Sequence, residues 1–293
     1  MNIPAYPKYR NIEISDKKLF DDLFSKIKPE ICEYTFANLF AWKDLYNLSL
    51  STLEDFVLLS SRKNETSNFF DPIGLGDKKS VIKKILKDGK TSFILVQEDT
   101  KKLFENESDI SIFLDRDNCD YLYNSEDLIV LKGKIYDGKR NYIKRFKSGN
   151  KYKYVRINDK NNNECLKFVD KWCEFRDCEG AESLKHEKKA IKEMLGNFSC
   201  LKLFGGLIEI GGEIAALAAG ELLNKDTFVI HILKSKNGVI GLNQTMNNEF
   251  LANEAAGFKF VNMEQDLGVE GLRKSKLSYH PLKLINKYTI RLK

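Results

Sequence analysis

The chain has 293 residues, of which 42% are hydrophobic and 31% charged, and its formal net charge is +6. This length and apolar content suffice for one large core or for two units of about 140 residues each. No apolar run approaches the roughly 18 residues of a membrane-spanning helix, and the amino-terminal residues lack the apolar core of a secretion signal. We therefore expect a cytoplasmic protein without a transmembrane segment.

The six cysteines contain no CxxC pair. The common zinc sites use such closely spaced pairs, so we expect no metal. A cytoplasmic chain of this size rarely depends on disulfides, and we interpret the cysteines as free thiols that mostly pack in the core. They are Cys32, Cys119, Cys165, Cys173, Cys178 and Cys200.

The first part of the chain mixes strands and helices. Phe56–Ser60 and Ser92–Gln97 are short apolar runs typical of strands, whereas Lys78–Lys87 places four aliphatic residues at helical spacing. This mixture predicts an α+β unit.

A basic segment follows. Between Lys132 and Arg156, ten Lys or Arg residues stand against the single acid Asp137, a local charge of +9 that exceeds the net charge of the chain. Aromatic residues are interleaved with these cations, so the segment offers charge for phosphates and rings for stacking bases. The cations that we expect to bind a polyanion are Lys139, Arg140, Lys144 and Arg145. The alternative is a solvated helix, Lys139–Lys147, that joins two domains.

Three polyanions fit this segment: a tRNA acceptor arm, anionic lipid head groups and the phosphates of coenzyme A. The segment also marks a domain boundary, because the polar stretch Asn158–Asn163 interrupts the pattern before a new helix begins. We therefore divide the chain into two domains, residues 1–155 and 156–293.

The second domain has a readable order of elements. The expected elements are a helix over Glu182–Leu195, strands over Leu201–Ile210, Glu213–Leu222 and Thr227–Lys234, a helix over Gly241–Asn253, and a strand over Phe258–Met263. The first two strands meet at Gly211-Gly212, the signal of a tight hairpin. Antiparallel strands followed by a crossover helix and a further strand predict a mixed sheet.

The last segment combines acids at a strand end with a cationic helix. Glu264–Asp266 directly follows the predicted strand, and a helix with several cations then runs toward Pro281. Asp266 and Arg273 thus fall close enough to face one pocket. The alternative for each is a solvated surface charge.

Motifs spread over the chain point to one family. They are Asp71-Pro72-Ile73-Gly74, Lys139-Arg140-Asn141 with Phe146, His231 with Lys234, Gly241 with Gln244, Asn247 with Phe250, Gln265-Asp266-Leu267-Gly268, Gly271-Leu272-Arg273-Lys274-Ser275-Lys276 and Tyr279-His280-Pro281. In these motifs the chain resembles the soluble relatives of the C-terminal domain of phosphatidylglycerol lysyltransferase. The resemblance implies an α+β fold of two GNAT-like (acyl-CoA N-acyltransferase) domains, each a mixed, mostly antiparallel sheet flanked by helices.

In that fold, as the resemblance implies, two central strands splay apart and expose main-chain N–H groups to a carbonyl and its developing oxyanion. The donor loop would be Lys234–Gly241. The acyltransferase phosphate-loop pattern is not met there, because Ser235 and Ile240 occupy its first and last positions. Leu233 also stands where we expect a Glu, two residues after His231.

The resemblance and the local chemistry together indicate candidate residues for catalysis and for substrate binding. For catalysis we expect His231 or Asp266 as the base and Tyr279 as the proton donor to the leaving group. The substrate-binding candidates are Lys234, Gly238, Gly241, Asn247, Arg273 and Lys276.

The reaction that fits this site moves an acyl or aminoacyl group from an activated ester or thioester to an amine or hydroxyl, with no metal or other cofactor required. An aminoacyl-tRNA donor explains both the basic segment and the resemblance, and a lipid is among the acceptors. One alternative is an N-acyltransferase that uses acyl-coenzyme A as its donor. Another is a catalytically silent protein of the acyltransferase fold that binds nucleic acid or anionic lipid.

Overall fold

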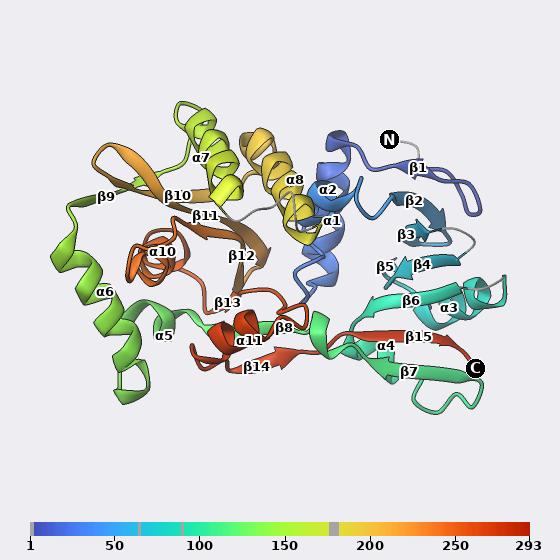
Figure 1. Cartoon of the computed structure of the whole chain (residues 1–293). Coiled ribbons are helices and arrows are strands. Elements are labelled where there is room, and N and C mark those ends of the chain that lie inside the picture. The colour runs from blue at the N-terminus through green and yellow to red at the C-terminus, as the bar shows by residue number, and fades with distance from the viewer. Residues whose placement is uncertain (1–2, 64–65, 89–90, 176–181) are drawn as a thin grey trace. The chain divides into compact units, whose positions relative to one another are not determined.

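A computed structural model describes residues 3–63, 66–88, 91–175 and 182–293 (Figure 1). Contacts divide the chain into two compact units. Unit 1 comprises Met1–Asp120, Gln265–Arg273 and Leu284–Lys293, and unit 2 comprises Tyr121–Glu264 and Lys274–Lys283. Residues 121–155 fall in unit 2 because strands on both sides of the basic segment join its sheet. Our boundary after residue 155, drawn from composition, stays a prediction.

Unit 1 is built on an eight-stranded sheet in the order β1-β2-β3-β4-β6-β15-β7, with β5 paired to β3. Its strands are β1 (Arg10–Asn11), β2 (Leu48–Leu53), β3 (Phe56–Lys63), β4 (Thr66–Phe70), β5 (Ile73–Gly74), β6 (Thr91–Val96), β7 (Ile110–Leu114) and β15 (Tyr288–Leu292). Its helices include α1 (Lys17–Ile27), α2 (Phe36–Trp42), α3 (Lys78–Lys87) and α4 (Glu98–Lys102), with 3-10 turns η1 (Ile14–Asp16) and η2 (Arg116–Asn118).

The helix α3 shows why this sequence folds as it does. The Asp77 side chain caps it by accepting a hydrogen bond from the Ser80 N–H at 3.0 Å. Its four aliphatic side chains are fully buried against strand residues such as Phe69 and Phe93. The predicted helix Lys78–Lys87 is confirmed, as are strands at Phe56–Ser60 and around Ser92.

Unit 2 contains a seven-stranded sheet in the order β14-β8-β13-β12-β11-β10-β9. Its strands are β8 (Asp120–Asn124), β9 (Tyr152–Arg156), β10 (Phe204–Ile210), β11 (Glu213–Asn224), β12 (Thr227–Ser235), β13 (Phe260–Asn262) and β14 (Lys283–Ile285). Its helices include α5 (Ser125–Val130), η3 (Lys134–Tyr136), α6 (Asp137–Gly149), α7 (Asn162–Phe175), α8 (Glu182–Gly196), α9 (Phe198–Leu201) and α10 (Leu242–Phe250) with the π-helical turn η5 (Leu251–Ala255). Helix α11 (Glu270–Leu277) begins in unit 1 and ends in unit 2.

The glycine hairpin of unit 2 is confirmed. β10 and β11 pair antiparallel up to Ile210 and Glu213, and both turn glycines have positive φ, 61° at Gly211 and 85° at Gly212. Positive φ at both central positions is what a type I′ turn requires. One boundary was wrong: Leu201 ends the short helix α9, and β10 begins only at Phe204.

The expected α+β fold, with two mixed and mostly antiparallel sheets flanked by helices, is confirmed. Among the described residues, β4 pairs parallel with β6 in the first sheet, and β12 pairs parallel with β13 in the second. Within the described ranges, no helix is both long and apolar enough to cross a membrane.

The cysteines follow the expectation with one correction. Cys32, Cys119, Cys165 and Cys200 are not in disulfides, and the first three are buried. Cys173 is disulfide-bonded, whereas Cys178 lies outside the described residues. Bridging depends on two Cβ atoms lying about 4 Å apart, which sequence spacing alone does not reveal.

Candidate functional site

The strands β12 and β13 of unit 2 separate shortly after they begin to pair. Their parallel ladder joins only Thr227–Val229 to Phe260–Asn262. β12 continues to Ser235 and stays paired with β11 on its other side, whereas β13 ends at Asn262. Along a strand, main-chain groups point alternately to the two sides. Past Val229, the groups of β12 that face away from β11 therefore have no ladder partner on β13.

A β-bulge lies at the same place. β11 pairs Gly220 with Ile230 and the next residue, Ala219, with Ile232, so His231 is the extra residue. Gly220 is required here, because a Cβ on it would lie 2.1 Å from the Val229 carbonyl oxygen. Bulges re-aim side chains and are frequent beside active sites. The bulge and the strand separation thus make His231 the centre of the candidate site.

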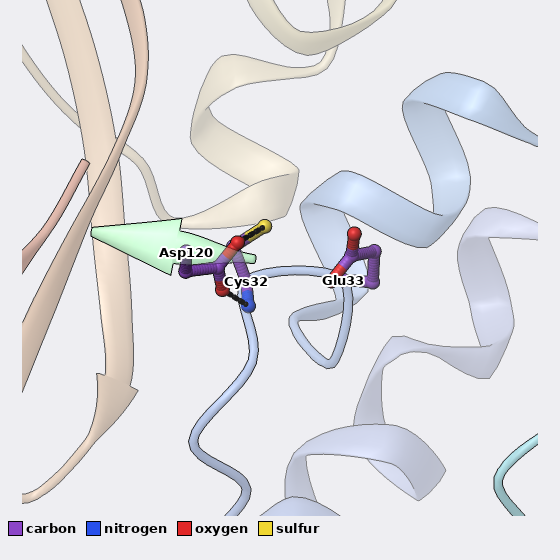
Figure 2. A group of neighbouring side chains, drawn as sticks. All are labelled: Cys32, Glu33 and Asp120. Atoms are coloured by element: carbon purple, nitrogen blue, oxygen red, sulfur yellow. Dashed lines mark hydrogen bonds between the residues drawn. The ribbon is translucent and has the colours of Figure 1, made fainter. Parts of the chain in front are cut away.

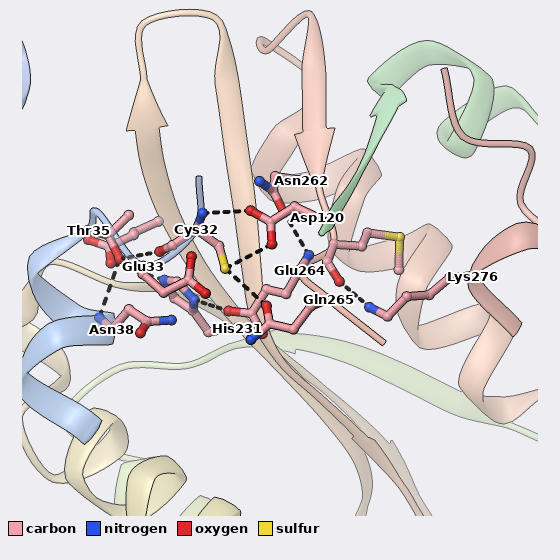
Figure 3. Close-up of polar contacts among 12 residues, drawn as sticks. Cys32, Glu33, Thr35, Asn38, Asp120, His231, Asn262, Glu264, Gln265 and Lys276 are labelled. Carbon is pink, nitrogen blue, oxygen red and sulfur yellow. Dashed lines mark hydrogen bonds and ion pairs between the residues drawn. The ribbon is translucent and has the colours of Figure 1, made fainter. Parts of the chain in front are cut away.

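His231 is held between two carboxylates. Its Nδ1 lies 2.7 Å from Glu264 Oε1 (Figure 3), and its Nε2 lies 3.1 Å from Glu221 Oε1. Burial disfavours the charged ring, but the hydrogen bonds and negative charges of Glu221 and Glu264 outweigh it and raise the pKa of His231 to about 10. At neutral pH both ring nitrogens therefore carry protons, and His231 is not ready to act as a base.

Glu264 is the member of this group that a substrate reaches most easily. Its side chain is 23% exposed, compared with 1% for His231 and 9% for Glu221. Its backbone has φ of 59°, and its N–H donates to the buried Asn262 Oδ1 at 2.7 Å (Figure 3). A non-glycine residue in the left-handed region often marks a functional constraint.

Sequence reasoning missed both carboxylate partners. Glu264 lies at the end of the predicted strand, but the sequence pattern led to Asp266, two residues later, as the candidate base. Glu221 is the only acid in the run Ile214–Leu223 of β11, and it is buried. A lone acid at a buried strand position was the available signal, since such a group needs a partner.

Asp266, the other candidate base, belongs to unit 1, and both of its carboxylate oxygens already accept hydrogen bonds. Its oxygens accept hydrogen bonds from Arg273 Nε at 2.9 Å and Nη2 at 2.8 Å, from Arg116 Nη1 at 3.2 Å and from the Gly268 N–H at 2.9 Å. Arg273 also binds Asp117 at 2.6 Å. Asp266 and Arg273 therefore come together, as expected, but in an ion-pair network that favours a structural role for both.

Tyr279 and Asn247 meet in unit 2. The Asn247 side chain is hydrogen-bonded to the Tyr279 hydroxyl, and burial raises the pKa of that hydroxyl to about 12. Lys139 Nζ lies 3.8 Å from the centre of the Tyr279 ring and 2.6 Å from Ser278 Oγ. Burial thus makes Tyr279 a weak proton donor, and the contacts of Lys139 give it a packing role.

Two of the substrate-binding candidates, both lysines, are already paired in unit 2. Lys234 Nζ lies 2.7 Å from Glu187 Oε1 and 4.5 Å from the Trp172 ring centre. Lys276 is buried, and its Nζ donates to the Met263 carbonyl. Both amines therefore stabilise the local fold.

The two loop glycines differ in what requires them. Gly238 and Gly241 both have φ of 79°. A Cβ on Gly241 would lie 2.0 Å from the Tyr142 carbonyl oxygen of α6, whereas a Cβ on Gly238 would meet nothing within 4 Å. Close packing of α6 against the start of α10 explains Gly241 without a ligand.

The basic helix α6 divides into paired and unpaired cations. Arg140 binds Asp137 and donates to the carbonyls of Leu131 and Gly133. The side chains of Lys144 and Arg145 are exposed and make no hydrogen bond or ion pair with any residue that the structure describes. Phe146 anchors the helix in the core with no exposed surface. The helix is thus part of unit 2 rather than a free linker.

Unit 1 contains a buried ionic cluster that the sequence did not suggest. Figure 2 shows Cys32, Glu33 and Asp120, whose potential ligand atoms lie within 4.8 Å of one another. Lys287 Nζ donates to Asp120 at 2.6 Å and to both Glu33 oxygens at 2.6 and 2.7 Å. Although burial disfavours its charge, Asp120 and its neighbours raise the pKa of Lys287. The Lys287 ammonium supplies the positive charge beside these carboxylates. The cluster of Cys32, Glu33 and Asp120 therefore does not fit a metal ion in addition to the ammonium.

The family model described as phosphatidylglycerol lysyltransferase, C-terminal, matches residues 24–291. The chain belongs to this family. A conserved protein of unknown function from Bacteroides thetaiotaomicron is 31% identical with a TM-score of 0.91, covering 97% of this chain and 99% of that one. No curated protein matches.

Two further solved structures share the fold at low identity. The C-terminal domain of a putative lysylphosphatidylglycerol synthetase from Agrobacterium fabrum is 12% identical with a TM-score of 0.66, covering 94% of this chain and 91% of that one. L-PGS from Bacillus licheniformis is 13% identical with a TM-score of 0.66, covering 100% and 94%. The resemblance read from the sequence is thereby confirmed, and an acyltransferase-like function is supported at that level.

Within this family fold, the parallel pair of unit 1 is closed by its own side chains. Asp71 follows the last paired residue of β4, is 1% exposed, and accepts hydrogen bonds from Gln97 N at 3.2 Å and Thr100 Oγ1 at 2.8 and 2.9 Å. Lys78 Nζ lies 3.1 Å from the same carboxylate. The end of the β4–β6 ladder is therefore filled by a satisfied polar network.

Proposed function

We propose that the chain is an aminoacyltransferase that moves an aminoacyl group from aminoacyl-tRNA to an amine or hydroxyl acceptor, at the β12–β13 separation of unit 2. The observation that carries the proposal is the coincidence of three features at His231: the end of the parallel ladder, the β-bulge, and the ion pair with Glu264. The family match supports the class of reaction.

In the proposed reaction, the ester carbonyl of the donor lies against the main chain of β12 beyond Val229. N–H groups there stabilise the oxyanion that forms when the acceptor attacks. The acceptor forms a bond to the carbonyl carbon and gives its proton to the Glu264 carboxylate. The bond to the ribose oxygen then breaks, and that oxygen takes the proton, so the products are the aminoacylated acceptor and uncharged tRNA.

His231 is a positioning residue in this scheme. Its charged ring holds one oxygen of Glu264 at 2.7 Å and so fixes the position of the carboxylate before the acceptor arrives. Glu221 holds the opposite ring nitrogen and fixes the orientation of the imidazole. Glu264 thus replaces His231 and Asp266 as our preferred base.

The basic helix α6 is the proposed contact for the tRNA. Of the four cations that we expect to bind a polyanion, Lys144 and Arg145 have side chains without a protein partner in the described ranges, whereas Lys139 and Arg140 hold the helix in place. When exposed, unpaired cations bind phosphates, counterions are released from the nucleic acid, and that release makes the affinity depend on salt.

The test measures binding and transfer separately. Fluorescence anisotropy with tRNA over a salt series gives the number of phosphate contacts, and a double variant, Lys144→Ala with Arg145→Ala, should reduce the slope by about two. A labelled amino acid on tRNA is then incubated with a small amine, and with vesicles that carry glycerol head groups, to measure transfer. Acetyl-coenzyme A in the same assay tests the competing donor. Binding without any transfer would instead support a silent nucleic-acid binder.

A further inference from the structure

A groove on unit 2 lies beside the basic helix and has no part in the proposed transfer step, although Lys144 on its rim is also a proposed tRNA contact. It has a volume of about 550 Å³ and is lined by the end of α5, one face of α6 and Asn248 of α10. Cavities of this size fall in the range of small-molecule sites. The space fits one small ligand rather than the backbone of a long polymer.

The floor of the groove is apolar. Ile129 and Val130 from α5 and Ile143 from α6 line it. Val130 remains 55% exposed, although a valine is favoured in contact with other apolar groups. An alkyl chain laid on this floor would bury that surface.

The rim of the groove is cationic, but most of its charge is compensated. Arg140, Lys144 and Lys147 recur on one face of α6 at helical spacing. Arg140 is paired with Asp137, and Lys147 Nζ lies 2.7 Å from Glu249. Lys144 makes no ion pair in the described part of the chain. One net positive charge therefore stands above the apolar floor.

The C-terminal end of α5 does not repel an anion in this groove. The last carbonyls of a helix carry partial negative charge that repels anions. Asn248 Nδ2 donates to the carbonyls of Leu128 at 3.1 Å and Ile129 at 2.7 Å, and Arg140 donates to that of Leu131. These hydrogen bonds cover the helix end on the side of the groove.

We propose that this groove binds a single-chain anionic amphiphile of the fatty-acid type, with its carboxylate on Lys144 and its chain along Ile129, Val130 and Ile143. One uncompensated cation matches a monoanionic head group better than a run of phosphates. An aliphatic floor matches an alkyl chain better than a nucleobase, which prefers aromatic rings. The proposal stands independently of aminoacyl transfer.

The experiment is calorimetric titration of the whole chain with dodecanoate below its micellar concentration. We expect saturable binding of one molecule per chain. Decanoate should bind up to about fifteenfold more weakly, because each buried methylene contributes about fourfold in affinity. Decyltrimethylammonium, which pairs the decanoate chain length with a cationic head, should not bind.

Two variants and one control locate the site. Val130→Asp puts an anion on the floor at an exposed position, and Lys144→Glu reverses the rim charge. Each should weaken dodecanoate binding at least about fivefold. Lys151→Glu makes the same charge change at an exposed residue outside the groove and should leave binding unchanged. Thermal unfolding of each variant checks that the fold is retained.

The result that overturns the proposal is the absence of saturable dodecanoate binding, or equal affinity in Val130→Asp and the parent chain. Binding only to vesicles of anionic phospholipid would also overturn it, in favour of a bilayer surface. Because Lys144 is shared with the proposed tRNA contact, Val130→Asn, which makes the floor polar without adding charge, is the variant that separates the two ligands. It should lose dodecanoate and keep tRNA.

Discussion

The two units end their parallel strand pairs in different ways, and the difference is the reason that we propose unit 2 as the site of transfer. In unit 1, Asp71 follows the last paired residue of β4, and its hydrogen bonds to Gln97 and Thr100 close the end of the ladder. In unit 2, His231 follows the ladder of β12 and binds Glu264, which is partly exposed. A buried carboxylate whose oxygens are all engaged is a structural element. A charged pair with one exposed member can take part in a reaction.

Replacement of Asp71 should have the largest effect on stability and none on transfer. Asp71→Asn weakens the ion pair with Lys78 and the hydrogen bond from Thr100. Breaking such a buried pair costs about 3 kcal/mol. Urea unfolding measures the loss, and transfer per folded molecule should match the parent chain. A large loss of transfer at full folding would place chemistry in unit 1 instead.

Replacement of Glu264 should, by contrast, reduce transfer. Glu264→Gln keeps the shape of the side chain but removes the proposed proton acceptor, so transfer should fall about 100-fold or more, which corresponds to about 2.7 kcal/mol in the barrier. Stability should also fall, because the buried charged ring of His231 loses one of its two carboxylate partners, so transfer is compared per folded molecule. The control is Glu126→Gln, an exposed acid of α5 in the same unit. Unchanged transfer in Glu264→Gln would remove Glu264 as the base.

His231 should make the stability of the parent chain depend on alkaline pH. The pKa of His231 is about 10 in the folded chain, whereas an unfolded histidine titrates near 6.5. The charged ring therefore stabilises the fold fully below about pH 6.5, and this stabilisation is lost as the pH rises toward 10. Between about pH 7.5 and 9.5 the parent chain should lose about 2.5 kcal/mol more stability than His231→Gln. The measurement is denaturant unfolding of both chains across this range, and parallel pH profiles would show that the ring is neutral.

Much of this fold was predictable, because its strongest signals are local. The four aliphatic residues of α3 and the Gly211-Gly212 turn each fix an element within a few residues. The partners of His231 were not predictable in the same way. Glu221 reaches it through a hairpin whose register shifts by one residue at a bulge, and Glu264 reaches it across a strand pair that is only three residues long.

The charge pattern of the sequence showed where cations and acids lie along the chain, but not which of them are free to bind a ligand. Asp266 and Arg273 were expected to face one pocket, and they do lie together, but they satisfy each other. Of the four cations assigned to polyanion binding on α6, Lys139 and Arg140 are held by local contacts. A sequence shows how many charges a segment carries, whereas only the fold shows which of them are already paired.

The difference between paired and unpaired cations leads to the prediction with the smallest expected effect, a change in tRNA affinity. It tests whether unit 2 binds the donor. Arg145→Ala removes an exposed cation without a protein partner in the described residues and should weaken tRNA binding by about 1 kcal/mol at low salt. Lys188→Ala is the matched control, since Lys188 lies in the same unit but is paired with Asp170 at 3.0 Å. It should leave tRNA affinity and its salt dependence unchanged. Equal losses in both variants would mean that tRNA responds to net charge alone, and the assignment of α6 as its contact would fail.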